Sequence, residues 1–280
     1  MQHEHPQNAD PETVDGFGKE WSTFAHGEDT PELRKAFSDY FAVFPWAALP
    51  ADAAGVDVGC GSGRWARYVA PRVGRLICVD ASEEALDVAR ANLARSPNVE
   101  FVHATIEDSG IPDGSLDFGY SLGVLHHVPD TRAALAACVR KLKPGAPFLV
   151  YLYYALDNRP LAFRALWRAS DLVRRGLSRA PYAARLAASE VIARGVYWPL
   201  ARTAELGAKL GLDVSQLPLS YYRDKGFYIM RNDALDRFGT KLEQRFTRSE
   251  IEVMMRAAGL ENIRFHEGEP YWCAVGTRCR

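Results

Sequence analysis

The chain has 280 residues, of which 48% are hydrophobic and 25% are charged. These proportions are typical of a globular protein with a sizeable core, and they exclude a chain that is disordered along its whole length. Because 34 Lys and Arg residues balance 35 Asp and Glu residues, no net charge draws the protein to nucleic acid or to an anionic membrane. We therefore expect no nucleic-acid partner.

The cysteines and the hydropathy of the chain predict its cellular location. The five cysteines form no Cys-x-x-Cys pair, and their odd number argues against a disulfide framework. The N-terminus lacks the basic and then apolar build of a signal peptide, and no apolar run approaches the ~18 residues of a membrane span. We expect a cytoplasmic protein with no stable membrane insertion.

Residues 1–50 precede the regular part of the chain. Residues 1–15 are polar and contain prolines, which predicts a frayed tail. From Phe17 to Pro50, aromatic and apolar residues recur at roughly helical spacing, and Thr30-Pro31-Glu32 is typical of a helix start. This segment is predicted to form a helical cap before the core.

Residues 51–156 alternate short apolar runs with helix-like segments. The runs cover residues 55–58, 75–79, 99–102 and 148–152, and this alternation predicts a parallel sheet with crossover helices. Ser82 is the expected N-cap of the helix after the second run, because Glu83 and Glu84 fall in its first turn.

Residues 157–246 break this rhythm and are mainly helical in pattern, which predicts an inserted lid subdomain. The first helix, after Asp157-Asn158-Arg159-Pro160, places one set of apolar residues on one face and four arginines on the opposite face. The apolar face is expected to pack inward, with the charged face in solvent; the alternative is a helix at a membrane surface. The apolar residues are Phe163, Leu166, Val173 and Leu177, and the arginines are Arg164, Arg168, Arg175 and Arg179.

Residues 247–280 are predicted to complete the core. Thr247-Arg248-Ser249-Glu250 indicates a helix that runs to Gly259. Two strand-like runs near 263–265 and 271–275 are expected to form an antiparallel edge. The predicted fold is an α/β doubly wound sheet, mostly parallel, with a helical insert.

A glycine-rich loop follows the first predicted strand, where residues 56–63 read VDVGCGSG. Glycines allow positive φ and a close approach of backbone to a ligand. The loop is not a dinucleotide fingerprint, since Arg64 takes the place of its last glycine, and it is not a P-loop. Asp80, at the end of the second strand, suits two ribose hydroxyls, although it could merely cap the next helix. Together the two features favour a nucleoside without phosphates, such as S-adenosyl-L-methionine.

Three motifs resemble those of a known family. The segments DVGCGSG (57–63) and VDAS (79–82) resemble the first two motifs of class I S-adenosyl-L-methionine-dependent methyltransferases. The segment LGVLHHV (122–128) resembles the fourth motif of the ubiquinone and menaquinone biosynthesis type, also called the type 11 group. The resemblance implies a Rossmann-like seven-stranded sheet. It also implies methyl transfer from S-adenosyl-L-methionine to an oxygen or nitrogen of a small-molecule acceptor, with release of S-adenosyl-L-homocysteine.

The resemblance also implies a set of cofactor-binding residues. The loop residues would meet the methionine portion, the residues at 80–81 the ribose, and the residues at 105–107 the adenine. In relatives the adenine motif often reads Gly-Asp-Ala, which this chain lacks, so Glu107 is the candidate substitute for the acid. Apart from the resemblance, the segment Phe17–Trp21 could form a lid over the sulfonium, although core packing is the favoured role of either ring. With Trp21 added, the set is Asp57, Gly59, Cys60, Gly61, Gly63, Asp80, Ala81, Thr105, Ile106, Glu107, Ser121 and Leu122.

Candidate catalytic residues lie in the segment that resembles the fourth motif. His126 and His127 would lie beside the methyl group, and histidine is the side chain best matched to taking a proton at neutral pH. We favour His127 as the base, while His126 could pack or cap a turn. No third ligand accompanies the pair, so no metal site is predicted.

A polar and aromatic stretch of the insert is the candidate acceptor site. Its residues are Tyr221, Tyr222, Arg223, Tyr228 and Arg231. Arginine forks suit an anionic small molecule, but structural ion pairs and aromatic packing would give the same pattern. Other functions left open are a lipid or quinone methyltransferase at a membrane surface, a tRNA-modifying enzyme and a non-catalytic cofactor-binding protein. A homodimer is compatible with the sequence.

Overall fold

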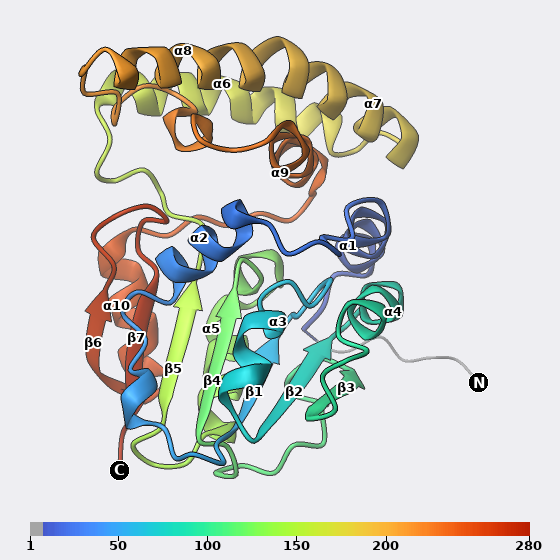
Figure 1. Ribbon diagram of the computed structural model, residues 1–280, viewed down its shortest axis with the longest axis vertical. Helices are drawn as coiled ribbons and strands as arrows, with labels where there is room; N and C mark the ends of the chain where they lie inside the picture. Colours follow the sequence, from blue (N-terminus) through green and yellow to red (C-terminus); the bar gives the residue numbers. More distant parts are fainter. Residues whose placement is uncertain (1–7) are drawn as a thin grey trace. The chain divides into compact units, whose positions relative to one another are not determined.

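A computed structural model describes residues 8–280 (Figure 1). The chain divides into two compact units. Unit 1 comprises Met1–Ala155 and Leu242–Arg280, and unit 2 comprises Leu156–Lys241. A frayed tail is predicted for residues 1–15, but this is wrong from Asp10 onward, because Asp10 is the N-cap of helix α1 (Pro11–Thr23). Residues 1–7 of that prediction lie outside the described residues.

Unit 1 is built on a seven-stranded sheet, as the sequence predicts, with the order β3-β2-β1-β4-β5-β7-β6. Strands β1 to β5 are parallel, and β7 is antiparallel to both β5 and β6. The last strand begins later than predicted, because Trp272 has a φ of 65° and ends any extended run there. The strands are β1 (Ala54–Val58), β2 (Arg75–Asp80), β3 (Val99–His103), β4 (Phe118–Leu122), β5 (Pro147–Tyr151), β6 (Leu260–Phe265) and β7 (Ala274–Arg278).

The helices of unit 1 begin where the sequence places caps. The side chains of Thr30, Ser82 and Thr247 each accept a backbone N–H from the first turn, and Glu250 completes a capping box. Besides α1, the helices are α2 (Pro31–Tyr40), η1 (Trp46–Ala48), α3 (Ala66–Val69), η2 (Ala70–Arg72), α4 (Glu83–Asn92), η3 (Leu125–His127), α5 (Thr131–Lys141) and α10 (Arg248–Ala257).

Helices cover both faces of the sheet (Figure 1). Residues of α5 and α10 form one core cluster with one sheet face, and residues of α2, α3 and α4 form another with the opposite face. The strand order reverses between β1 and β4, since β2 and β3 lie on one side of β1 and β5 on the far side of β4. In open α/β sheets this switch point is where the carboxyl ends of the strands leave room for a ligand.

Unit 2 is entirely helical in its regular elements. Its small core contains Tyr197, Met230 and Phe238, packed with alanines. A π-helical segment joins two of its helices without a break. The elements are α6 (Leu161–Leu177), α7 (Tyr182–Ile192), η4 (Ala193–Tyr197), α8 (Trp198–Lys209), η5 (Ser220–Tyr222) and α9 (Phe227–Gly239).

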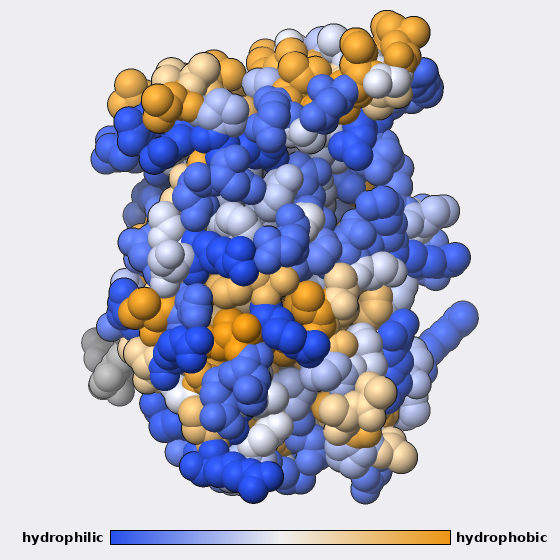
Figure 2. Space-filling model, turned by 90° about the vertical axis from the view of Figure 1, so that its left-hand side faces the viewer, coloured by the Kyte–Doolittle hydropathy of each residue, from blue (hydrophilic) through white to orange (hydrophobic). Residues whose placement is uncertain are grey.

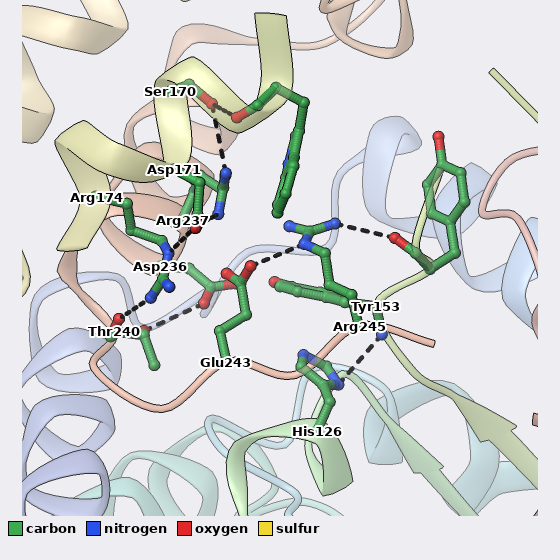
Figure 3. Close-up of polar contacts among 12 residues, drawn as sticks. His126, Tyr153, Ser170, Asp171, Arg174, Asp236, Arg237, Thr240, Glu243 and Arg245 are labelled. Carbon is green, nitrogen blue, oxygen red and sulfur yellow. Dashed lines mark hydrogen bonds and ion pairs between the residues drawn. The ribbon is translucent and has the colours of Figure 1, made fainter. Parts of the chain in front are cut away.

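The predicted inward face of the helix now seen as α6 is wrong in part, because Leu177 packs against the core of unit 2 but two other residues of that face do not. Leu166 and Val173 are each 57% exposed, and apolar residues are visible on the surface of this unit (Figure 2). The buried positions of α6 are instead Asp171 and Arg174, which form an ion pair of 2.7 Å. Arg174 also donates to the carbonyl oxygen of Thr240, so the inward face is held by polar contacts (Figure 3).

Candidate functional site

The glycine-rich loop between β1 and α3 turns back against β2. Gly59, Gly61 and Gly63 have φ values of 73°, 54° and 74°, which lie in the left-handed region that favours glycine. The amide N–H of Gly59 donates to the carbonyl oxygen of Val79 at 2.7 Å, and so does that of Cys60 at 3.2 Å. The loop therefore presents backbone, rather than side chains, at the carboxyl edge of the sheet.

Asp80 at the end of β2 fastens this loop. Its Oδ2 accepts the Gly61 N–H at 2.8 Å, and its Oδ1 accepts the Ser82 N–H at 2.9 Å. Burial raises the pKa of this carboxyl, while these backbone donors oppose the rise. A carboxylate has about four acceptor positions. Since the backbone N–H of Ala81 donates to Asp80 as well, about one position remains for a ribose hydroxyl.

Asp57 lies beneath the loop rather than at its surface. It is buried, and its Oδ2 accepts the Tyr120 hydroxyl at 2.9 Å. Burial raises the pKa of Asp57 to about 8. Cys60 is buried as well, and its hydrogen bond with Cys78 together with burial raises the pKa of its thiol well above the ordinary value. Both side chains are therefore positioned to support the loop backbone.

The segment that follows β3 holds the residues expected at the adenine. Ile106 is buried in the core, and Thr105 donates from Oγ1 to Asp108 at 3.1 Å. Glu107 accepts from the side-chain amide of Asn8 at 3.2 Å. Ala81, which follows β2, contacts the end of β3, since its carbonyl oxygen lies 2.9 Å from Nε2 of His103. Polar groups are thus present here without the usual Gly-Asp-Ala sequence.

The end of β4 combines buried side chains with an open turn. Ser121 donates from Oγ to the carbonyl oxygen of Val58 at 2.9 Å, and Leu122 is buried. The next residue, Gly123, has a φ of 80°, and no atom lies within 4 Å of the position that a Cβ would take. The backbone at Gly123 therefore borders open space, whereas the side chains of Ser121 and Leu122 are buried.

Helix α1 connects the loop with the histidine pair. The Trp21 indole packs on Gly61 so closely that a Cβ on this glycine would lie 2.8 Å from the ring. The Arg64 guanidinium lies 5.0 Å from the centroid of the same indole. One turn earlier in α1, the Phe17 ring centroid is 4.9 Å from that of His127. The N-terminal cap thus covers both the loop and the candidate base.

The two histidines differ in which ring nitrogen is bonded. Nδ1 of His127 lies 2.7 Å from the carbonyl oxygen of Leu242, which requires a hydrogen on Nδ1 and leaves the lone pair on Nε2. Nδ1 of His126 instead accepts the backbone N–H of Tyr153 at 3.4 Å. Burial holds the pKa of His126 well below its ordinary value. His127 is therefore the better placed base of the two.

A group that the sequence did not point to surrounds His126 (Figure 3). The ring of Tyr153 has its centroid 3.9 Å from that of His126. The Arg245 guanidinium lies 5.0 Å from the Tyr153 ring centroid and forms an ion pair of 2.8 Å with Glu243. Tyr153 could have been found as a residue just beyond the end of β5. Arg245 and Glu243 lie in an irregular segment that carries no periodic signal.

The candidate acceptor residues lie in unit 2 and mostly contact one another or their neighbours. The rings of Tyr221 and Tyr222 are 5.2 Å apart, and the Lys225 ammonium lies 4.1 Å from the Tyr221 ring. Arg223 donates to the carbonyl oxygen of Ser220, and Arg231 pairs with Glu190. Tyr228 is 43% exposed. These contacts are the structural ion pairs and aromatic packing that were the alternative to an acceptor site in unit 2.

Residues 8–280 contain neither a candidate metal site nor a candidate membrane-spanning helix. Within residues 8–280, no group of three or more His, Cys, Asp or Glu side chains could hold a metal ion. Over the same residues, no helix is long and apolar enough to cross a membrane.

Sequence comparison matches the core of unit 1 to a known domain. Residues 56–150 match a family model described as a methyltransferase domain. The ubiquinone biosynthesis O-methyltransferase of Hahella chejuensis is 36% identical over 115 residues, which are 40% of this chain and 46% of the relative. That of Aromatoleum aromaticum is 31% identical over 161 residues, or 54% of this chain and 64% of the relative. The matches thus span less than two thirds of either relative.

Solved structures share the fold over most of the chain. A SAM-dependent methyltransferase from Aquifex aeolicus has a TM-score of 0.51 at 15% identity, covering 93% of this chain and 96% of that one. A possible histamine N-methyltransferase from Thermotoga maritima has a TM-score of 0.50 at 19% identity, covering 95% and 99%. Residues 56–150 therefore match a methyltransferase domain, and the typical methyl donor of that domain family is S-adenosyl-L-methionine.

Proposed function

We propose that this protein transfers the methyl group of S-adenosyl-L-methionine to an oxygen or nitrogen of a small-molecule acceptor. The observation that carries the proposal is the arrangement of two groups covered by α1. These are the Gly61 loop held by Asp80, and His127 with its Nδ1 fixed on Leu242. The first suits the nucleoside of the cofactor, and the second suits a base for the acceptor.

The cofactor supplies an activated methyl group on a sulfonium centre. The residues of this chain would hold it and exclude water, since Trp21 and Phe17 cover the loop and the histidine. For a hydroxyl acceptor, the new oxygen–carbon bond forms as the sulfur–carbon bond breaks, and the acceptor proton passes to Nε2 of His127. An amine acceptor in its neutral form attacks directly and gives up its proton in the same way. S-adenosyl-L-homocysteine leaves as the other product.

The test is methyl transfer from radiolabelled S-adenosyl-L-methionine to a panel of phenols, sugars and amines. For an acceptor that is turned over, His127→Asn keeps a donor for Leu242 but lacks Nε2, so kcat should fall at least about tenfold. His266→Asn, elsewhere in unit 1, is the control and should keep the wild-type rate.

Two results would count against the proposal. Full activity in His127→Asn would remove the histidine from the mechanism. Binding of the cofactor without turnover of any member of the panel would favour the non-catalytic interpretation.

A further inference from the structure

Unit 2 exposes an apolar surface that its own core does not use. Among residues 8–280, the large apolar side chains that are clearly exposed lie in unit 2, apart from Val253 of α10. Five residues of α6 to α8 and the C-cap residue of α8, each 57–79% exposed, define what we call the apolar face: Leu161, Leu166, Leu172, Val191, Leu206 and Leu210. A soluble monomer rarely leaves apolar residues gathered in this way without a partner.

The charged side chains exposed on the same helices are all basic. Between residues 158 and 212 they are Arg168, Arg175, Arg179, Arg194 and Lys209. The acids of this segment are not exposed, and each forms an ion pair: Asp171 with Arg174, Glu190 with Arg194, and Glu205 with Arg202. Arg175, Arg194 and Lys209 share ion pairs with these acids, and two exposed aspartates, Asp157 and Asp213, flank the segment. Over residues 157–213, ten Lys and Arg residues against five Asp and Glu residues leave a net positive charge beside the apolar face.

Helical spacing places some of the basic and apolar residues on a common stripe, although Leu166 lies on another side of α6. On α6, Arg168 follows Leu161 by seven residues and precedes Leu172 by four, and Arg175 continues the stripe. Arg179 lies just beyond the C-cap of the helix. On α8, Lys209 follows Leu206 by three residues. The long stems of Arg and Lys can lie along apolar surface while their charged ends stay in water, so cations beside leucines are compatible with a membrane interface.

We propose that the apolar face docks on the surface of a bilayer rich in anionic phospholipids. The leucines would enter the boundary between headgroups and acyl chains, and Arg168 and Arg179 would meet the phosphates, together with the three cations that also contact acids of the same helices. The contact is peripheral, because no helix in residues 8–280 can cross a membrane. This inference does not depend on the methyltransferase activity.

Two other occupants fit the face less well. A second copy docked by a twofold axis would bring the same five cations against themselves, which is unfavourable. An RNA surface would be met by charge and by stacking side chains, whereas this face consists mainly of leucine. Charge complementarity thus favours the anionic bilayer.

The experiment is co-sedimentation of the full chain with vesicles. One set contains phosphatidylcholine mixed with phosphatidylglycerol, and the other contains phosphatidylcholine alone. Binding to the anionic set should be at least about tenfold tighter. Raising NaCl from about 50 to about 500 mM should weaken it, because salt screens the cations from the lipid phosphates.

Two variants separate the apolar and the electrostatic contributions. Leu172→Gln, Leu206→Gln and Leu210→Gln combined remove apolar area without changing charge, and should weaken binding about tenfold or more. Arg168→Gln with Arg179→Gln should weaken binding to anionic vesicles about tenfold, with little effect on phosphatidylcholine. The controls are Val253→Gln and the pair Arg95→Gln with Arg132→Gln, all at exposed positions of unit 1, and these should bind as wild type.

Several results would overturn the proposal. These are wild-type protein that stays in the supernatant with anionic vesicles, or leucine variants that sediment as wild type while keeping the wild-type circular dichroism spectrum. A dimer in analytical ultracentrifugation that the leucine variant loses, without vesicle binding, would assign the face to a second copy. Salt-sensitive RNA binding without vesicle binding would assign it to nucleic acid.

Discussion

The hydroxyl of Tyr120 and the carboxyl of Asp57 face each other across β4 and β1, joined by a hydrogen bond of 2.9 Å. Both side chains are buried, beneath the loop of which Gly59 is the first glycine. Burial raises the pKa of both groups, that of Asp57 to about 8. The carboxyl is therefore mostly protonated at neutral pH, and the pair stabilises the loop as neutral partners.

This pKa predicts how the stability of unit 1 depends on pH. The folded pKa of Asp57 is raised from 3.8 to about 8, so the folded state binds more protons than the unfolded state within that range. Stability therefore falls as pH rises from about 4 to about 8 and levels off above it. Asp57→Asn mimics the protonated acid and should make the melting temperature less dependent on pH across this window. Asp52→Asn, at an exposed position, is the control. A variant that follows the wild-type curve would refute the raised pKa.

Gly59 and Gly123 offer a matched pair for testing the loop. Both have positive φ, so an alanine at either position is strained by about 1–2 kcal/mol. At Gly59 a Cβ would also lie 2.3 Å from Cγ1 of Val124, whereas at Gly123 it would meet open space. Gly59→Ala should lower the free energy of unfolding in urea by at least about 1 kcal/mol more than Gly123→Ala. Equal effects would mean that the contact with Val124 is not close.

Asp171 is predicted to be the main ionic support of unit 2. It pairs with Arg174 at 2.7 Å and with Arg175 at 2.9 Å, and the Arg174 side chain is only 8% exposed. Although burial opposes the shift, the hydrogen bond and charge of Arg174 hold the pKa of Asp171 below its ordinary value. This contribution to stability is therefore present above about pH 4 and lost as pH falls further.

Asp171→Ala should destabilise unit 2 by about 3–5 kcal/mol at neutral pH, because it leaves the Arg174 guanidinium buried without its carboxylate. Hydrogen exchange resolved by peptide measures the effect in unit 2 separately from unit 1. Glu205→Ala removes a more exposed partner of Arg202 and Lys209, so it should change stability by less than about 1 kcal/mol. A small effect of Asp171→Ala would indicate that the polar inward face of α6 contributes little.

The parts of the fold that local chemistry determines were predictable from the sequence. Thr30, Ser82 and Thr247 cap the helices that they were expected to cap, since capping depends only on residues of the next turn. The strand and helix alternation of residues 54–154 likewise gave the parallel part of the sheet.

The orientation of α6 was not predictable in this way. Periodicity identified the stripe with Leu166 and Val173, but it does not tell which stripe faces inward. Which face of α6 is buried depends on the hydrogen bonds of Arg174 to Asp171 and to the carbonyl oxygen of Thr240, which is 66 residues away in the sequence. The same limit applies to the site, where Leu242 fixes the His127 ring across 115 residues. Contacts of such long range leave no local signal in the sequence.

The most direct test of the central claim is a calorimetric titration of the full chain with S-adenosyl-L-methionine and with S-adenosyl-L-homocysteine. We expect micromolar binding of both. Asp80→Ala removes the acceptors for the Gly61 and Ser82 amides and for the ribose, so it should weaken binding about a hundredfold. Asp87→Ala, at an exposed position of α4, should bind as wild type. Absence of binding by the wild-type protein, or undiminished binding by Asp80→Ala, would contradict the site as described.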